Sequence, residues 1–182
     1  DDEFQMRHRR NPIHHMQSRL KTIQSMLEKL KRKNYEVSIN SAVKNLQDIA
    51  GIRVICSYVQ DVYTIANLLV SQDDVHLVRM ADYIREPKPN GYRSLHLIVE
   101  IPVFLSEGRI LVPVEVQIRT IAMDFWASLE HSLRYKAQEY IPQHISDELQ
   151  RVATDIASLD QRMQAIHDQV DELSDARSDN AT

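Results

Sequence analysis

Apolar and polar positions alternate most regularly over residues 110–119, with the two-residue period of a β-strand. One face of this predicted strand is rich in valine, and the other face carries Glu115, Gln117 and Arg119. Polar side chains on a sheet face are costly to bury without partners. We therefore interpret the polar face of this strand as a surface that contacts a ligand.

Shorter patterns predict the remaining elements of a sheet. The predicted strands span residues 51–57, 75–81, 94–103 and 110–119, and the helices among them span residues 62–70 and 121–136. Two prolines and an Asn-Gly pair exclude a helix over residues 87–92 and predict a turn there. A second turn, near Glu107 and Gly108, joins the last two strands into a hairpin.

The amino-terminal part of the chain shows the period of a helix. Apolar residues at spacings of three and four predict an amphipathic helix over residues 12–33. At about 100° per residue, Lys21, Ser25, Lys29 and Arg32 lie together on a different face of this helix. The pattern therefore predicts a helix with an apolar stripe and a separate basic face.

The carboxyl-terminal part repeats apolar residues at alternating spacings of four and three, which gives four heptads. The repeating positions are Ile145, Leu149, Val152, Ile156, Leu159, Met163, Ile166 and Val170. Such a seam packs either on the protein's own domain or on a partner helix, and we expect residues 143–173 to form an oligomerisation helix. Residues 174–182 are expected to be a disordered tail.

Together these elements predict an α+β fold, a mixed β-sheet flanked by helices with N- and C-terminal helical extensions. A length of 182 residues fits one domain, which we place at residues 12–136. A single cysteine, Cys56, excludes a disulfide framework and is expected to be a small core residue. No apolar run is long enough to span a membrane, so we expect a cytoplasmic protein.

The net charge of −4 conceals an asymmetry between the two ends of the chain. Residues 1–33 carry nine basic and four acidic side chains, whereas residues 143–182 carry three basic and nine acidic ones. Either both ends are solvated helix faces, or the basic end forms a cationic face that holds phosphates. With only three glycines, the chain has no glycine-rich phosphate-binding loop.

Two carboxylates are candidates for metal-assisted chemistry. Asp48 precedes the predicted strand at residues 51–57, and Glu115 lies within the strand at residues 110–119. If those strands are neighbours, both carboxylates could share one Mg²⁺, which prefers oxygen ligands and substrate phosphates. A metal, many cations and no glycine-rich loop together indicate a polyphosphate that is held by side chains.

Four sequence segments give a more specific signal. They are Asp48-Ile-Ala-Gly-Ile-Arg53, Lys88-Pro-Asn-Gly-Tyr-Arg-Ser-Leu-His96, Glu115-Val-Gln-Ile-Arg-Thr120 and Met123-Asp-Phe-Trp-Ala-Ser-Leu-Glu-His131. Together they resemble the synthetase domain of the RelA/SpoT family over about residues 15–136, and the short chain is similar to the stand-alone small alarmone synthetases of bacteria. The resemblance implies a nucleotidyltransferase-like fold and an activity that transfers the β,γ-pyrophosphate of ATP to the 3′-hydroxyl of GDP or GTP. The products would be AMP and the alarmones ppGpp or pppGpp.

The resemblance also implies roles for individual residues. It places Mg²⁺ on Asp48 and Glu115, and Glu115 would also accept the proton of the 3′-hydroxyl. The ATP-binding positions are Arg19, Lys21, Ser25, Lys29 and Arg53, with the two arginines stacking on either side of adenine. The acceptor-binding positions are Arg85, Lys88, Tyr92, His96, Gln117 and Asp124, with Tyr92 stacking on guanine.

Several positions stay open or depart from the family pattern. Asp124 either contacts the edge of guanine or is a charge favoured at the N-terminus of a helix. Many relatives carry a basic residue where this chain has Ala81, and Arg79, two residues upstream, could replace it with altered geometry. Glu130 and His131 belong to the fourth segment but have no separate role assigned to them.

Two other functions remain as alternatives. Some relatives are toxins that pyrophosphorylate tRNA 3′ ends or adenine nucleotides, and the basic N-terminal part leaves an RNA acceptor possible. A catalytically silent nucleotide- or RNA-binding regulator is the second alternative, although it has no need for both Asp48 and Glu115. The histidines do not form a hydrolase metal site, so alarmone hydrolysis is not expected. By resemblance, the protein is expected to be a homotetramer built through terminal helices.

Overall fold

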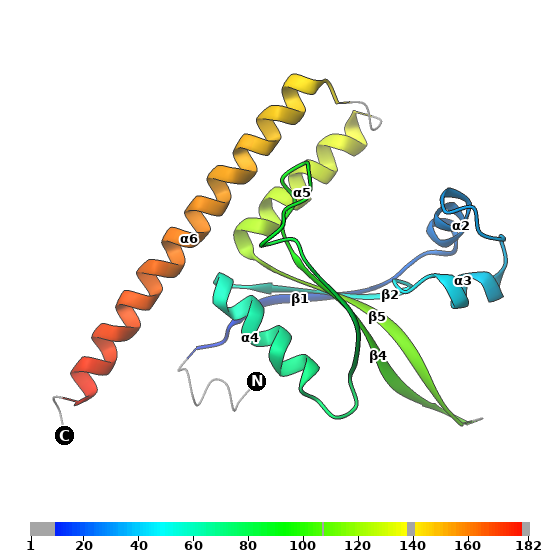
Figure 1. Ribbon diagram of the computed structural model, residues 1–182, viewed down its shortest axis with the longest axis horizontal. Helices are drawn as coiled ribbons and strands as arrows, with labels where there is room; N and C mark the ends of the chain where they lie inside the picture. Colours follow the sequence, from blue (N-terminus) through cyan, green and yellow to red (C-terminus); the bar gives the residue numbers. More distant parts are fainter. Residues whose placement is uncertain (1–9, 107, 138–140, 180–182) are drawn as a thin grey trace.

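A five-stranded mixed sheet lies at the centre of the computed structural model, which describes residues 10–106, 108–137 and 141–179 (Figure 1). The elements in chain order are β1 (Ile13–Leu20), α2 (Ile23–Arg32), α3 (Ile39–Asn45), β2 (Ala50–Cys56), α4 (Val59–Val70), β3 (His76–Asp82), β4 (Leu95–Leu105), β5 (Gly108–Thr120), α5 (Ile121–Lys136) and α6 (Gln143–Asp179). The predicted α+β class with a mixed sheet and flanking helices is confirmed.

The strand order in the sheet is β1-β2-β5-β4-β3. β2 and β5 are parallel neighbours, and all other pairs are antiparallel. In this register Arg19 lies opposite Gly51, Gly51 opposite Glu115, and Arg53 opposite Gln117. Because paired residues on neighbouring strands project to the same face, the register alone places Arg19, Arg53 and Glu115 on one face of the sheet.

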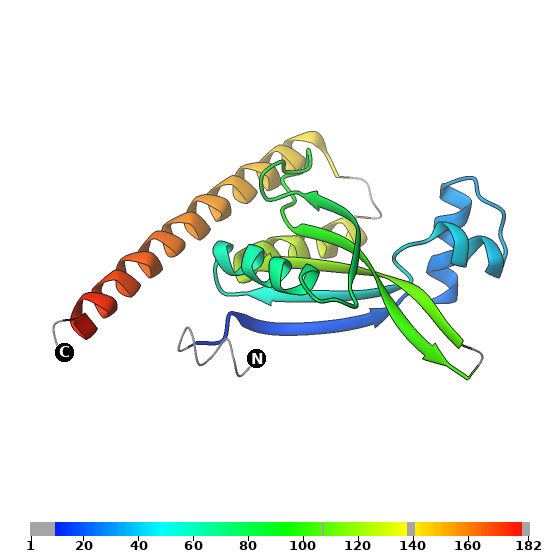
Figure 2. The ribbon, with the colours of Figure 1, turned by 60° about the horizontal axis from the view of Figure 1, so that its bottom comes forward.

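The opposite face of the sheet forms the main hydrophobic core. Alternate residues of the three central strands meet Val62 and Ala66 of α4, which covers this face (Figure 2). The buried strand residues are Val54, Cys56, Leu95, Leu97, Val99, Val114, Val116 and Ile118. The burial of Cys56 agrees with its expected place in the core. The sheet is therefore apolar on one face, and its polar face is left for the site described below.

Most predicted elements of the sheet are present with shifted ends. The turn predicted over residues 87–92 is closed by a 2.8 Å hydrogen bond from the Gly91 amide to the Lys88 carbonyl. Gly91 has φ +89°, a backbone conformation that a residue with a side chain rarely adopts. The predicted hairpin is confirmed by the pairing of Leu105 with Gly108, while Glu107 lies outside the described residues.

The prediction of one long helix over residues 12–33 is wrong. Residues Ile13–Leu20 form the edge strand β1, which pairs with β2, and the helix begins only at Ile23 after the N-cap Thr22. The first part of the apolar stripe does not mark a core face, because Met16, Leu20 and Ile23 are at least 60 % exposed, whereas Leu30 at its other end is buried. Hydrogen bonding to β2 decides the conformation of this segment, since tertiary pairing overrides a weak local pattern.

Two further consequences concern the amino-terminal part of the fold. The expected N-terminal helical extension is replaced by β1 followed by α2, and α3 was not predicted. A small second core joins Leu30 of α2 to Ala42 of α3 and to Leu46, which follows α3. These two helices lie at the end of the sheet away from α6 (Figure 1).

The carboxyl-terminal helix α6 packs along α5 and α4. The residues that face its own domain recur every seven positions: Ala153 packs beside Trp126, Asp160 accepts a hydrogen bond from Thr120, and His167 stacks on Tyr58. The helix continues to Asp179, so the disordered tail expected over residues 174–182 is wrong up to that residue, and residues 180–182 lie outside the described chain. Within the described residues, no helix is both long enough and apolar enough to cross a membrane.

Candidate nucleotide-binding site

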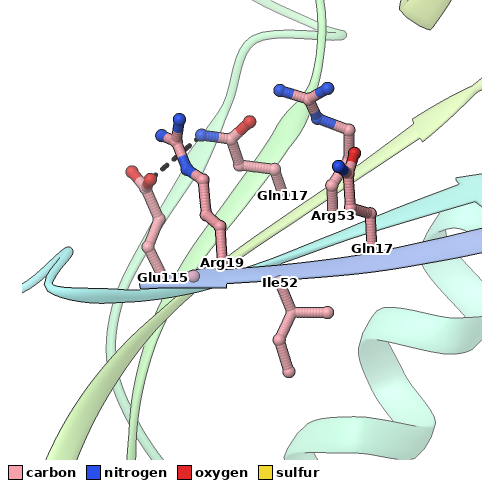
Figure 3. Close-up of a pocket in the computed structure, with 7 residues that line it drawn as sticks. Gln17, Arg19, Ile52, Arg53, Glu115 and Gln117 are labelled. Atoms are coloured by element: carbon pink, nitrogen blue, oxygen red, sulfur yellow. Dashed lines mark hydrogen bonds between the residues drawn. The ribbon is translucent and has the colours of Figure 1, made fainter. Parts of the chain in front are cut away.

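The polar face of β1, β2 and β5 forms the floor of a cavity of about 180 Å³. Figure 3 shows Gln17, Arg19, Arg53, Glu115 and Gln117 projecting to one side of these strands, while Ile52 points to the other side. Gly51 adds no side chain between Arg19 and Glu115, and a Cβ there would lie 3.6 Å from the Glu115 carbonyl oxygen. The three strands therefore bring two of the predicted ATP-binding arginines to the predicted catalytic glutamate.

Asp48 lies in the loop before β2 and forms ion pairs with two lysines. Lys21 Nζ is 2.8 Å and Lys29 Nζ 2.5 Å from Asp48 Oδ2. The turn between β1 and α2 supplies Lys21, and α2 itself supplies Lys29. Burial raises the pKa of Asp48, but the hydrogen bonds from Lys21 and Lys29 outweigh it and hold that pKa below its ordinary value. Two of the predicted phosphate-binding lysines thus meet the predicted metal ligand.

The second oxygen of Asp48 is a candidate metal ligand. Asp48 Oδ1 is buried and has no hydrogen-bond partner among the described residues, which suits an oxygen that takes a ligand. The negative charge of Asp48 tends to raise the pKa of Glu115, so the two carboxylates are close enough to interact electrostatically. Among the described residues, however, no group of three or more acidic, histidine or cysteine side chains could hold a metal by itself. A divalent cation here would need oxygens from a substrate, which is the coordination that Mg²⁺ commonly adopts.

Glu115 is held by neighbours on both of its oxygens. His96 Nδ1 lies 3.6 Å from Glu115 Oε1, and Gln117 Nε2 donates to Glu115 Oε2 at 3.0 Å. The contact with His96 is the main cause that lowers the pKa of Glu115, with burial acting in the opposite direction. The carboxylate is therefore fixed in orientation and kept ionised, the form that can bind a cation or act as a base.

A hydrogen-bonded chain leads from Glu115 to Tyr92. Gln117 Oε1 accepts from Arg119 Nη2 at 2.7 Å, and Arg119 Nη2 also donates to the Tyr92 hydroxyl at 3.3 Å. The Tyr92 hydroxyl lies 2.8 Å from His96 Nε2, and His96 Nδ1 lies 3.6 Å from Glu115 Oε1, so His96 lies beside both ends of this chain. The structure thus gathers Tyr92, His96 and Gln117, three of the predicted acceptor-binding residues.

Lys88 and Arg119 surround the ring of Tyr92 with positive charge. The Lys88 ammonium lies 4.7 Å from the centre of the Tyr92 ring and 4.5 Å from that of Tyr83, and the Arg119 guanidinium lies 5.5 Å from the Tyr92 ring. A planar, electron-rich base could stack on this ring while its phosphates reach the cations. Lys88 therefore lies beside Tyr92, and its contact with an acceptor phosphate stays a prediction.

Asp124 lies between two arginines. Its Oδ1 is 3.4 Å from Arg119 Nη1 and 3.7 Å from Arg53 Nη1, and it is buried without a hydrogen bond. Arg119 is 2 % exposed, and burial lowers its pKa. Arg53 and Arg119 line a further cavity of about 410 Å³ together with Tyr92 and Glu130. Asp124, at the start of α5, lies close to both arginines and so connects the two sides of the site.

Two predicted residues are not brought into this cluster. Ser25 is in the first turn of α2, where its amide and hydroxyl bond to the hydroxyl of the N-cap Thr22. Arg85 has a largely exposed side chain that pairs with Asp82 and lies 5.4 Å from the Tyr63 ring. Arg85 lines a separate cavity of about 280 Å³ with Arg93 and Asp160.

Other residues also shape the site, among them Gln17, which was not singled out from the sequence. Gln17 lies on the same face as Arg19 and lines the first cavity. The sequence signal for Gln17 is its position two residues before Arg19. This spacing places the two side chains on one face only if the segment is a strand. Arg79 pairs with Ile98 and Ala81 with His96, so both lie on the polar face of the sheet, as the parity of the strand predicted. Asn90 and Glu130 interact with each other beside Tyr92.

Fold and site define an α+β protein whose open sheet face gathers two carboxylates with lysines and arginines, the groups that hold polyphosphates and a divalent cation. Residues 18–140 match the family model described as a region found in RelA / SpoT proteins. The chain belongs to this family. The resemblance that the four sequence segments indicated is therefore confirmed.

Similar proteins cover most of the chain. The chain is 46 % identical over 169 residues to the GTP pyrophosphokinase YwaC of Bacillus subtilis (strain 168). The matched residues make up 93 % of this chain and 80 % of that protein. It is 40 % identical over 168 residues to the GTP pyrophosphokinase YjbM of the same organism, covering 92 % and 78 %. The crystal structure of small alarmone synthetase 1 from Bacillus subtilis bound to its product pppGpp superposes with a TM-score of 0.84 at 38 % identity, covering 93 % of this chain and 86 % of that one.

Proposed function

We propose that this protein is a (p)ppGpp synthetase, which transfers the β,γ-pyrophosphate of ATP to the 3′-hydroxyl of GDP or GTP and releases AMP. The observation that carries the proposal is the polar sheet face, where the Lys21–Asp48–Lys29 cluster and the network from Glu115 to Tyr92 meet. Relatives named GTP pyrophosphokinases, matched over most of their length, support the same activity.

The donor nucleotide is assigned to the side of the site formed by β1, β2 and α2. Arg19 and Arg53 line one cavity, and a planar guanidinium on each side of adenine would favour stacking. Lys21 and Lys29 lie next to Asp48, where triphosphate oxygens could replace the carboxylate as their partners. Ser25 at the start of α2 could donate its hydroxyl to the same phosphates.

Asp48 and Glu115 are assigned as the ligands of Mg²⁺. The buried, unpartnered Asp48 Oδ1 fits this role, and Mg²⁺ commonly uses one or two carboxylates together with substrate phosphates. When bound, the ion would offset negative charge that develops on the transferred phosphates. The lysines of the cluster supply positive charge to the same region.

The acceptor nucleotide is assigned to the side formed by β4, β5 and the turn before β4. Guanine would stack on Tyr92, while Lys88, with Arg85 further out, would hold the 5′ phosphates. His96 and Gln117 fix the orientation of Glu115, and Asp124 holds Arg53 and Arg119 next to this side of the site.

Glu115 would then act as the general base. It accepts the proton of the 3′-hydroxyl, whose oxygen forms a bond to the β-phosphorus of ATP. The bond from the β-phosphorus to the oxygen that joins it to the α-phosphate breaks, and that oxygen leaves with AMP. Most of the rate enhancement would come from positioning the two nucleotides in line and from stabilising charge.

The carboxyl-terminal helix is assigned to self-association into a homotetramer. In the seam predicted over residues 143–173, Leu149 and Ile156 pack on the chain's own Trp126 cluster. Val152, Leu159 and Ile166 recur every seven residues and stay exposed to solvent. A second α6 could cover this row, and the acidic and basic ends of the chain would allow charge pairing around it.

The nucleotide substrates place the proposed activity in the cytoplasm.

The proposal is tested by incubating the protein with ATP, Mg²⁺ and either GDP or GTP, and separating the nucleotides by anion-exchange chromatography. We expect equal amounts of AMP and ppGpp or pppGpp, and loss of both products in D48N. The matched control is D73N, because Asp73 is an exposed carboxylate in the loop after α4 and lies outside the site.

Each contrary outcome of this assay has a defined meaning. AMP formation without a guanosine product would exclude the assigned acceptor, and labelling of tRNA by radioactive ATP would then identify an RNA acceptor. No AMP with any acceptor, together with retained nucleotide binding, would show a silent binding protein. Full activity of D48N would show that the reaction does not require the Asp48 carboxylate.

A further inference from the structure

Glu130 is a buried carboxylate that the proposed reaction does not use. It lies in the third turn of α5, is 7 % exposed and lines the cavity that also contains Tyr92. Its Oε1 accepts hydrogen bonds from Asn90 Nδ2 at 3.1 Å and from the guanidinium of Arg134. Burying a carboxylate costs free energy unless the carboxylate is paired. The two contacts with Asn90 and Arg134 therefore indicate the role of Glu130.

The contact with Asn90 connects α5 to the turn that carries Tyr92. Asn90 uses both ends of its side-chain amide: Nδ2 donates to Glu130, and Oδ1 accepts from the Tyr92 backbone amide at 3.2 Å. The same turn is closed by the Gly91-to-Lys88 hydrogen bond and by a 3.1 Å bond from the Lys88 amide to the Tyr92 carbonyl. Fixing Asn90 therefore fixes the backbone on both sides of Tyr92.

The opposite side of the turn lies against α6. A Cβ on Gly91 would come within 2.6 Å of Ala153 Cβ, and Arg93 Nη1 donates to the Ala153 carbonyl at 3.2 Å. The turn is thus held between α6 on one side and Glu130 on the other. On the α5 side, the turn is held by the hydrogen bond between Asn90 and Glu130.

We propose that Glu130 is a positioning residue for the acceptor nucleotide: through Asn90 it holds the residue 88–92 turn so that the Tyr92 ring and Lys88 keep the geometry required for binding the acceptor. This inference rests on the proposed function. It assigns Glu130 no contact with either nucleotide and no part in proton transfer. The donor side of the site, formed by β1, β2 and α2, does not depend on it.

A purely structural role for Glu130 would act through Arg134, because a Glu–Arg pair four residues apart on a helix stabilises that helix. Three variants separate the two roles. E130Q keeps an oxygen that can accept from Asn90, E130M has nearly the same size but no acceptor, and R134M removes the helical ion pair while leaving the bond to Asn90.

The test measures KM for the acceptor and KM for ATP in each variant of the full chain. We expect E130M to raise the KM for GDP or GTP about tenfold, with the KM for ATP within about twofold of the starting protein. E130Q and R134M should both keep the acceptor KM within about twofold. In the N90A background, E130M should cause no further increase, because the hydrogen bond that it would break is already absent.

Hydrogen–deuterium exchange of the ligand-free protein gives a readout that does not depend on activity. Peptides covering residues 88–93 should exchange faster in E130M than in E130Q, while peptides covering β5 exchange equally. Faster exchange in a protein that makes no alarmone would support the positioning role and reject the proposed reaction.

Three results would overturn the inference: an unchanged acceptor KM in folded E130M, an equal rise in the KM for ATP, or an R134M effect as large as that of E130M. If E130M does not fold, N90A alone decides the matter, since it breaks the same bond at a partly exposed turn. Unchanged acceptor KM and unchanged exchange in N90A would then reject the role of Glu130.

Discussion

Glu115 combines three features that suit a general base at the residue scale. It projects from a strand in the middle of the sheet, its oxygens are oriented by His96 and Gln117, and Asp48 lies close enough to influence its pKa. A side chain fixed in this way does not have to reorganise when the reaction begins, and such preorganisation is a large part of catalysis by phosphoryl-transfer enzymes.

Replacing the carboxylate by an amide tests this assignment. E115Q should fold and bind nucleotides, but kcat should fall by about 10²–10⁴-fold, because the amide cannot take the proton. The rate of AMP release measures the effect. E100Q is the matched control, since Glu100 lies in the middle of β4 opposite Pro113, makes none of the contacts described for Glu115, and should leave kcat unchanged. A turnover of E115Q close to that of the unaltered protein would exclude Glu115 as the base.

The single cysteine offers a probe of the core at the same scale. Cys56 is fully buried, and burial raises the pKa of its thiol to about 12, with the nearby Asp61 acting in the same direction. Because the thiolate is the reactive form, the native protein should not react with a disulfide reagent at about pH 8. Reaction should become complete in guanidinium chloride. Rapid labelling of the native protein would mean that the sheet opens locally at β2.

The elements of the sheet could be predicted from the sequence where the alternation of side chains is strong. In β5 the apolar positions Val114, Val116 and Ile118 enter the core, and Glu115 and Gln117 point into the site. β1 could not be predicted in this way, because it is an edge strand with exposed side chains on both faces and no alternation to detect. Its conformation depends on β2, whose paired residues lie thirty or more positions away in the chain.

Much of the candidate site also follows from the sequence, but its connections do not. The segments around Asp48, Tyr92 and Glu115 indicated residues that lie near one another in the structure, and the parallel pairing of β2 with β5 places two of these segments side by side. That Lys21 and Lys29 meet on a single oxygen of Asp48 depends on the turn between β1 and α2, which the predicted continuous helix did not contain. The Asn90–Glu130 bond joins residues forty positions apart and has no local signal.

The junction of α5 and α6 makes a prediction at the scale of elements. Asp160 is buried and accepts a 2.5 Å hydrogen bond from Thr120, the N-cap of α5; burial raises its pKa, although this hydrogen bond acts in the opposite direction. Since the folded-state pKa lies above the unfolded value, ionisation is less favourable in the folded protein. Stability contributed by Asp160 is therefore lost as the pH rises above the ordinary value of 3.8.

D160N removes this titration and keeps an oxygen that accepts from Thr120. We expect D160N to raise Tm by about 2–4 °C at about pH 7.5, and the gain should shrink towards zero near pH 4. Differential scanning calorimetry at both pH values measures it. D155N on the exposed side of the same helix is the control and should change Tm at neither pH. A loss of stability at the higher pH would show that the charge of Asp160 is favourable.

At the scale of the whole molecule, α6 has one face that its own domain covers and another that none of the residues described by the structure covers. Ala153, Asp160 and His167 contact α5, α4 or the loops beside them, whereas Leu159 is 52 % and Ile166 53 % exposed. A row of exposed apolar residues with a seven-residue period is typical of helix pairing. The heptad pattern therefore belongs to two surfaces, of which one packs on the domain and the other is exposed within the described part of the chain.

The exposed row should hold the proposed tetramer together, and light scattering after gel filtration tests this. L159E/I166E places four negative charges in each pair of facing helices, so we expect it to elute as a smaller species that retains its secondary structure, because the replaced side chains make little contact with their own domain. S158E/A165E adds the same charge at exposed positions outside the seam and should keep the assembly of the unaltered protein. A monomeric unaltered protein, or a tetramer that survives L159E/I166E, would contradict the proposed role of α6.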